Sequence, residues 1–241
     1  QGCTSFNEII AKGYGEPQNA KEFASLAQWV NYDGHRSLFE SRSQNRKGLL
    51  MWMSHSCWPS MVWQTDDYYF EPTAAYFAIK KASEPLHIQW NPATDEVEVV
   101  NYSAGTHKGM TAKVQILNMD ASVAWEKEAT VDSNEDTTNK CIKLSFPADL
   151  SKVHFIKMVL TENGKVVSDN FYHRSLEENN YQDLRQLAKV ALQTTTTVDK
   201  NADGTWSAVS VVENKTSTPA LMIRLNVVGN KDGQQLLPVF Y

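Results

Sequence analysis

Residues 97–173 carry a series of short runs of β-branched and apolar residues, with turn residues between them. The runs are VEVVNYS (97–103), AKVQILN (112–118), CIKLSF (141–146), VHFIKMVL (153–160) and VVSDNFYH (166–173). Asn163–Gly164, between the last two runs, is a strong hairpin signal. Short strands at this spacing predict an antiparallel β-sandwich over residues 86–175. We expect its hydrophobic core to include Val97, Val99, Val114, Ile116, Leu144, Phe155 and Val159.

The chain before this region has helical periodicity. Residues 18–43 repeat apolar side chains at the i, i+3, i+4, i+7 spacing of one helix face. That face consists of Phe23, Leu26, Ala27 and Val30. Gly34 predicts a bend or a break in this helix. Residues 72–82 predict a second helix, because Pro72 suits its first turn and Pro85 lies just beyond its end.

Between these helices lies Leu49–Met53, an apolar run whose length suits a fully buried strand. One strand cannot form a sheet by itself, and a buried strand flanked by helices is typical of α/β folds. We therefore expect a chain of α/β plus all-β class. In it, we expect residues 1–85 to be a segment of a (β/α)8 TIM barrel. The sandwich follows this segment.

The last part of the chain predicts a second, shorter β region. Residues 176–192 are polar and then mildly amphipathic, which indicates a linker with a short helix. The run Thr194–Thr197 then opens a new strand, and the later runs VSVVEN and MIRLN echo the earlier VEVVN and VQILN. This echo predicts a second immunoglobulin-like sandwich over residues 193–241. The segment is shorter than the roughly 100 residues of a complete domain, so we expect it to be partial.

The charge and hydropathy of the chain exclude some classes of partner. A net charge of −5 and a pI near 5.7 argue against nucleic acid, because no basic stripe is present to neutralise phosphates. No apolar run approaches the roughly 20 residues that span a bilayer, so we expect no membrane partner. The first residues lack both an initiator Met and the features of a signal peptide. We therefore expect the chain to begin inside a longer protein.

The cysteines predict neither a disulfide scaffold nor a metal centre. Cys3, Cys57 and Cys141 are few and widely spaced. We expect no cofactor and no metal site, and we interpret Cys57 as a free, packed thiol.

The stretch GLLMWMSHSCWPSMVWQTDDYYF at 48–70 contains more aromatic surface than a core strand needs. It follows the expected barrel strand, and chemistry in such barrels takes place at the carboxyl ends of the strands. Aromatic faces suit sugar rings, while carboxylates and imidazoles suit their hydroxyl groups. The candidate substrate-binding residues are Trp52, His55, Trp58, Trp63 and Asp67. Packing of the tryptophans, ordinary hydrogen bonding of His55 and turn capping by the aspartates remain alternatives.

Residues 52–91 resemble glycoside hydrolase family 2, at the last barrel strand, last helix and exit segment. The nearest branch contains exo-β-D-glucosaminidases, mannosylglycoprotein endo-β-mannosidases and β-mannosidases. The matching positions are Trp52, Trp58–Pro59, Asp67–Tyr68–Tyr69, Ala75–Tyr76–Phe77, Lys80–Lys81–Ala82 and Glu84–Pro85–Leu86–His87–Ile88–Gln89. Asp66 and Ala78 depart from the family pattern, and Asp66 leaves open which sugar hydroxyl its position meets. The resemblance implies that residues 1–85 are the C-terminal segment of a TIM-barrel catalytic domain, with its last strand and flanking helices. It also implies immunoglobulin-like sandwich domains after the barrel.

The family resemblance implies a retaining glycosidase that uses two glutamates, one as acid/base and one as nucleophile. Both are expected on earlier barrel strands, so the partner of this chain is the N-terminal remainder of the parent enzyme. Glu8 follows an Asn, as the family acid/base does. It also opens an amphipathic helix close to the expected last strand, so we interpret it as a solvated helix residue. We therefore expect no catalytic residue in this chain and no activity from it alone.

Other properties are implied less directly. The expected substrate of the parent is a β-linked glucosaminide or mannoside, and the residues at hand do not discriminate between the two sugars. Extracellular or periplasmic localisation rests on the resemblance alone. A freestanding carbohydrate-binding or adhesion protein built from sandwich modules is the alternative function. We also expect His87 to pack between domains, and Glu84 to pair with Lys80 or Lys81 as an ordinary surface contact.

Overall fold

The computed structural model describes residues 2–41, 48–59, 64–229, 233 and 235–236. Three α-helices come first along the chain: α1 (Gly2–Tyr14), α2 (Ala20–Ser41) and α3 (Ala74–Ala82). Seven strands follow: β1 (Leu86–Asn91), β2 (Glu96–Asn101), β3 (His107–Asn118), β4 (Val123–Ser133), β5 (Thr137–Lys143), β6 (Val153–Glu162) and β7 (Lys165–Ser175). The 3-10 helix η2 (Gln182–Gln186) then leads to strands β8 (Gln193–Lys200) and β9 (Trp206–Glu213).

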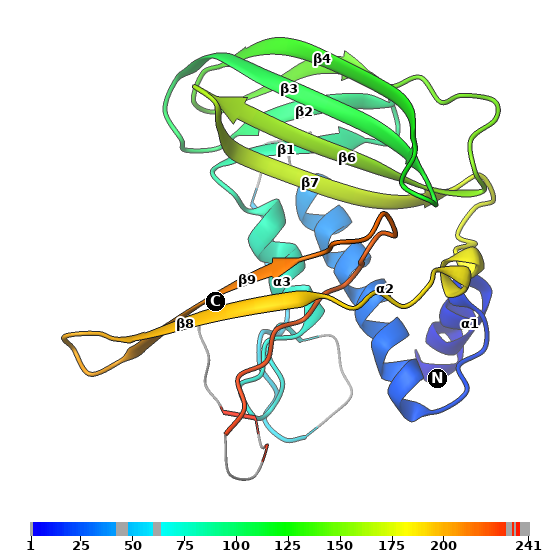
Figure 1. Ribbon diagram of the computed structural model, residues 1–241, viewed down its shortest axis with the longest axis vertical. Coiled ribbons are helices and arrows are strands. Elements are labelled where there is room, and N and C mark those ends of the chain that lie inside the picture. Colours follow the sequence, from blue (N-terminus) through cyan, green and yellow to red (C-terminus); the bar gives the residue numbers. More distant parts are fainter. Residues whose placement is uncertain (1, 42–47, 60–63, 230–232, 234, 237–241) are drawn as a thin grey trace.

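Strands β1 to β7 form two packed antiparallel sheets, as the strand pattern predicted. One sheet has the order β1-β2-β5 and the other the order β4-β3-β6-β7. Figure 1 shows this sandwich at one end of the molecule, with α2 and α3 meeting it from below. Strands β1 and β4 were not among the predicted runs. The core between the sheets includes Ile88, Val99, Ile116 and Met158, all fully buried.

The two β6 residues that were expected in the sandwich core, Phe155 and Val159, do not belong to the core between the sheets. Ile156, Met158 and Leu160 point into the core between the sheets. Phe155 is also fully buried, but it lies on the outer face, where its ring stacks on Phe171 at 5.2 Å between centroids. Val159, which was expected in the core, is only half-buried. Both faces of β6 carry apolar side chains, so its pattern does not indicate which face turns inward.

The hairpin turn between β6 and β7 agrees with its sequence. Asn163 has φ 51° and Gly164 has φ 76°, and such consecutive left-handed residues are typical of a type I′ turn. This turn fixes β6 against β7 over their whole length, from Glu162 opposite Lys165 to Val153 opposite Ser175.

Helix α2 runs without interruption through Gly34, so the chain has no helix break there. A single glycine costs about 1 kcal/mol relative to alanine, which a helix of 22 residues can absorb. Its fully buried residues are Arg36, Phe39 and Glu40, near the sandwich. The face predicted to be buried (Phe23, Leu26, Ala27 and Val30) is only half-buried.

The predicted buried strand at Leu49–Met53 is absent. These residues form no strand, and the side chain of Leu50 is 99% exposed. A strand needs hydrogen-bonding neighbours, and within the described ranges every named strand pairs antiparallel elsewhere. The following helix α3 was predicted correctly, although Pro72 precedes its N-cap residue Thr73 rather than lying in the first turn. The described residues therefore do not themselves form a barrel.

The chain after the sandwich is loosely packed. The short helix in the predicted linker is present as η2, and β8 begins at the predicted position. Strands β8 and β9 pair antiparallel as a two-stranded ribbon, with almost every residue exposed. In the part of the chain that the structure describes, no helix is both long and apolar enough to cross a membrane.

A buried polar cluster joins the helices to the sandwich. His87 of β1 is fully buried, with Nε2 3.1 Å from Glu40 Oε1 and Nδ1 3.2 Å from Glu84 Oε2. Glu40 also accepts hydrogen bonds from Asn170 Nδ2 (2.9 Å) and the Tyr172 hydroxyl (2.9 Å). The expected interdomain position of His87 is confirmed. The same carboxyl of Glu84 accepts a bond from Ser168, so Glu84 does more than form a surface contact.

Charge pairing at this junction sets the protonation of its groups. Burial opposes the charged form of His87, but hydrogen bonds to both carboxylates outweigh it and raise the imidazole pKa above its ordinary 6.5. Burial would raise the pKa of Glu84, but its bonds with His87 and Lys81 hold that pKa below the ordinary 4.5. The Lys81 Nζ lies 2.7 Å from Glu84, which confirms their predicted pairing. The charged forms of His87 and Glu84 therefore stabilise each other at this junction.

Candidate functional site

The aromatic segment before α3 is an irregular loop held by backbone bridges. The Asp66 N–H donates to the Ser54 carbonyl at 3.0 Å, and isolated bridges pair Asp66 with His55 and with Pro72. The Thr65 hydroxyl donates to the Ser54 carbonyl at 2.8 Å, and the Ser56 hydroxyl donates to the Gln64 side chain. We call residues 54–59 and 64–73 the aromatic loop.

The aromatic loop is anchored to α2. The N–H of Ala74, the first residue of α3, donates to Gln28 Oε1 at 2.7 Å. This bond satisfies one of the backbone donors that a helix leaves unpaired at its start. The Thr73 hydroxyl donates back to the Gln64 carbonyl at 2.8 Å. The loop therefore has a fixed position relative to two helices.

His55 lies against Phe70. The two rings stack with centroids 4.6 Å apart and an interplanar angle of 17°. Phe70 has φ 64°, a left-handed conformation that is unusual for a bulky residue. The sequence showed both residues to be aromatic but gave no signal of this pairing, because Phe70 was not among the candidate residues. One face of the His55 ring is therefore occupied by Phe70.

Asp67 caps the turn that presents Phe70. Its Oδ1 accepts the backbone N–H groups of Tyr69 (2.8 Å) and Glu71 (2.9 Å). Its own N–H donates to the Glu71 carbonyl at 3.0 Å. Of the two roles that the sequence left open for the aspartates, capping describes Asp67 well. Asp66 Oδ2 accepts a bond from the Thr65 hydroxyl at 2.9 Å.

The tryptophans of the segment are exposed. Trp52 is 79% exposed and Trp58 is 67% exposed, so neither is part of a core formed by the described residues. Trp63, the remaining candidate, lies outside the described residues. Cys57 is an exposed free cysteine, so the prediction that it is packed was wrong. Tyr69 and Phe70 are 60% and 62% exposed, which adds to the aromatic surface.

The described part of this surface combines exposed aromatic rings with polar side chains. Exposed aromatic faces next to a histidine and carboxylates suit a ring with apolar and hydroxylated sides. Glu8 is exposed on α1, as predicted. Among the described residues, no group of three or more His, Cys, Asp or Glu side chains could hold a metal ion.

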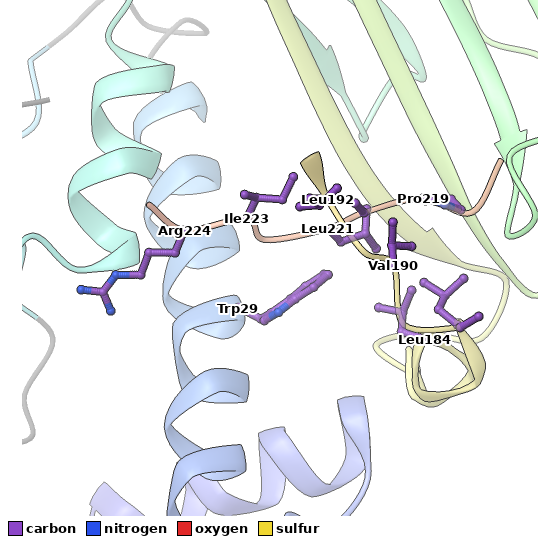
Figure 2. Close-up of a pocket in the computed structure, with 11 residues that line it drawn as sticks. Trp29, Leu184, Val190, Leu192, Pro219, Leu221, Ile223 and Arg224 are labelled. Carbon is purple, nitrogen blue, oxygen red and sulfur yellow. The ribbon is translucent and has the colours of Figure 1, made fainter. Parts of the chain in front are cut away.

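Two clefts lie along α2 and do not include the candidate residues. One, of about 460 Å³, is lined by Trp29, by residues of 184–192 and by residues of 219–224. Figure 2 shows the Trp29 side chain extending from α2 toward Leu221 in this cleft. The other, of about 550 Å³, lies between α2, the start of α3 and residues 221–225. Trp52, His55, Trp58 and Asp67 line neither cleft.

The sequence of this chain is similar to one family model and to several known proteins. Residues 170–241 match the exo-beta-D-glucosaminidase Ig-fold domain family. The chain is 31% identical over 265 residues to an exo-beta-D-glucosaminidase of Streptomyces avermitilis, covering 97% of this chain and 29% of the relative. It is 29% identical over 168 residues to a mannosylglycoprotein endo-beta-mannosidase of Lilium longiflorum, covering 66% of this chain and 18% of the relative.

The fold has a close counterpart among solved structures. A variant of the exo-chitosanase CsxA of Amycolatopsis orientalis, in complex with PNP-beta-D-glucosamine, matches with a TM-score of 0.89 and 28% identity. The match covers 97% of this chain and 31% of that chain. The chain therefore spans less than a third of the length of these relatives.

Proposed function

The chain belongs to the branch of glycoside hydrolase family 2 that contains exo-β-D-glucosaminidases and mannosylglycoprotein endo-β-mannosidases, and from this premise we propose that it serves as the C-terminal part of a retaining exo-β-D-glucosaminidase. The observation that carries this proposal is similarity over 97% of the chain to an exo-beta-D-glucosaminidase. The lily mannosidase relative covers only 66% of the chain, which favours glucosamine over mannose as the sugar.

In this proposal the aromatic loop and Trp52, which precedes it, form one wall of the subsite that holds the non-reducing sugar. The exposure of Trp52, Trp58 and Phe70 supports it, because exposed aromatic faces are available to stack on a sugar ring. Trp52 and Trp58 contribute ring faces for the sugar, and His55 contributes an imidazole beside them. Asp67 belongs to the same proposed wall, because it fixes the turn that carries Phe70.

The two catalytic glutamates belong to other parts of the parent enzyme. The helices α2 and α3, with the aromatic loop between them, then correspond to the end of a TIM barrel. The apolar run Leu49–Met53 would complete its last strand only when neighbouring strands are present to hydrogen-bond it. The 99% exposure of Leu50 supports this proposal, because an isolated barrel strand has nothing to pack against.

The test is an assay of the full-length enzyme on 4-nitrophenyl β-D-glucosaminide, with the β-D-mannoside as the competing substrate. We expect turnover of the glucosaminide with a kcat/KM at least tenfold above that for the mannoside. Faster turnover of the mannoside would show that the enzyme is a β-mannosidase rather than a β-glucosaminidase. Binding of glucosamine oligosaccharides without turnover of either substrate would favour the alternative, a non-catalytic carbohydrate-binding protein.

A further inference from the structure

The segment 221–225 crosses α2 and reaches the base of the aromatic loop. Met222, Ile223 and Leu225 line the cleft of about 550 Å³ together with Pro72 and with residues of α2 and α3. Pro72 directly follows the turn that carries Phe70. A segment from the last part of the chain therefore lies beside the proposed sugar-binding wall.

Arg224 makes a polar contact between segment 221–225 and the aromatic loop. Figure 2 shows its side chain pointing away from Trp29, past α2. Its guanidinium Nη2 forms an ion pair with Glu71 Oε1. The side chain of Arg224 is 49% exposed and that of Glu71 is 23% exposed, so the pair lies at the rim of the cleft rather than in a core.

The backbone of Glu71 is held in the turn by two hydrogen bonds with Asp67. Its N–H donates to Asp67 Oδ1 at 2.9 Å, and its carbonyl accepts the Asp67 N–H at 3.0 Å. Phe70 lies between these residues with φ 64°, and its ring stacks on His55. A left-handed conformation of a bulky residue is unfavourable and persists only when its surroundings hold it. The contacts from Arg224 to His55 therefore form one continuous series.

We propose that Arg224 is a positioning residue, which holds the Asp67–Glu71 turn so that Phe70 and His55 keep their places in the sugar-binding wall. This inference rests on the proposed function and deepens it. In this proposal Arg224, which follows the sandwich in the chain, supports substrate binding through its ion pair with Glu71. Arg224 itself contacts neither the sugar nor the reacting atoms.

The experiment compares Arg224→Ala with the native full-length enzyme in two measurements. The first is hydrogen–deuterium exchange of the peptides that cover 64–73. We expect exchange there to rise about two- to fivefold, because exposed ion pairs stabilise by up to about a factor of five. The second is steady-state kinetics on the β-D-glucosaminide. We expect KM to rise by a similar factor with kcat nearly unchanged, since the loop binds the sugar but performs no chemistry.

Lys215→Ala is the matched control. Lys215 pairs with Glu213 at 3.1 Å in the same part of the chain and is as exposed as its partner, but the pair does not adjoin the aromatic loop. We expect it to leave both measurements unchanged. Arg224→Lys, which keeps the charge, should recover most of the native KM. The double variant Arg224→Glu with Glu71→Arg exchanges the two charges. Its KM should lie closer to the native value than that of either single variant.

The outcomes separate this proposal from the proposed function. Unchanged exchange of 64–73 in a folded Arg224→Ala enzyme would overturn the positioning role. An equal loss in Arg224→Ala and Lys215→Ala would also overturn it, because general destabilisation would then explain the effect. If the native full-length protein does not hydrolyse the glucosaminide, the proposed function is wrong. The exchange measurement still decides in that case whether Arg224 holds the turn.

Discussion

His87 Nε2 lies 3.1 Å from Glu40 Oε1, which places an imidazole of the first sandwich strand against a carboxylate from the end of α2. His87 is fully buried and Glu40 is 6% exposed. Arg36, one turn before Glu40, places its guanidinium 4.1 Å from the ring centroid of Tyr172. Charged and polar groups from both the helices and the sandwich therefore join these two parts of the molecule. Such a junction fixes orientation, because only one relative placement satisfies all the groups.

Removal of one partner at this junction should destabilise the protein strongly. Glu40→Ala leaves His87, Asn170 and Tyr172 without their shared acceptor. We expect a loss of about 3–5 kcal/mol in the free energy of unfolding, the usual cost of breaking a buried charged pair. Urea denaturation followed by circular dichroism measures it. The comparison is Glu22→Ala near the start of α2. It breaks the surface ion pair between Glu22 and Arg185 of η2 and should cost less than about 1 kcal/mol. Equal costs for the two variants would contradict a special role of the junction.

The junction should make stability depend on pH in a defined range. The folded pKa of His87 is raised, so its contribution is complete below about pH 6.5 and is lost as pH rises through the folded pKa. The folded pKa of Glu84 is lowered, so its contribution is present above about pH 4.5 and is lost as pH falls through the folded value. We expect the two contributions together to be largest between these values.

Denaturation at several pH values tests this dependence. The unfolding free energy of the native protein should fall above pH 6.5, with a slope of up to about 1.4 kcal/mol per pH unit. His87→Gln should be less stable at pH 5.5 and should show a flatter profile between pH 6 and 9. A His87→Gln profile parallel to the native one over that range would show that another group titrates.

The phase of β6 can be tested with adjacent substitutions. Met158 is fully buried in the core between the sheets, while Val159 is half-buried on the outer face. Met158→Ala should lower the unfolding free energy by about 2–5 kcal/mol. Val159→Ala should lower it by less than about 1.5 kcal/mol. A larger loss from Val159→Ala would mean that the strand presents the opposite face to the core.

The proposed sugar-binding role of Trp52 predicts a specific kinetic defect. Burial of a tryptophan ring against a sugar contributes about 1–3 kcal/mol to the binding free energy. Trp52→Ala in the full-length enzyme should therefore lower kcat/KM by roughly ten- to a hundredfold, with circular dichroism unchanged. Trp206→Ala is the control, since Trp206 is 66% exposed on the β8–β9 ribbon. Equal kcat/KM for the native enzyme and Trp52→Ala would assign Trp52 to packing within the parent enzyme.

The 241-residue chain alone should not hydrolyse aryl β-glycosides. The proposed catalytic glutamates lie elsewhere in the parent, and Glu8 is an exposed residue of α1. The measurement is release of 4-nitrophenol by the purified chain, with Glu8→Gln as the comparison. Release above background that is lost in Glu8→Gln would give Glu8 the catalytic role that its sequence context argued against.

The sequence by itself determined the features that depend on neighbours along the chain. Alternating runs predicted strands of the sandwich, and Asn163–Gly164 predicted its hairpin, because turn type depends on local backbone preferences. Helix α3 followed from the residues at its ends in the same way. The aromatic residues at 52–70 could be recognised as a candidate site from composition and from family resemblance, without any knowledge of how they are arranged.

Only the tertiary structure decided which groups meet across the chain. The face that β6 buries depends on the opposite sheet, and its own residues are apolar on both sides. Leu49–Met53 has the composition of a buried strand, but a strand forms only where neighbouring strands supply hydrogen bonds. The pairing of His87 with Glu40, 47 residues apart, and the contact of Arg224 with Glu71 leave no periodic signal in the sequence. Such contacts arise from packing of elements in three dimensions, and no local pattern of residues encodes them.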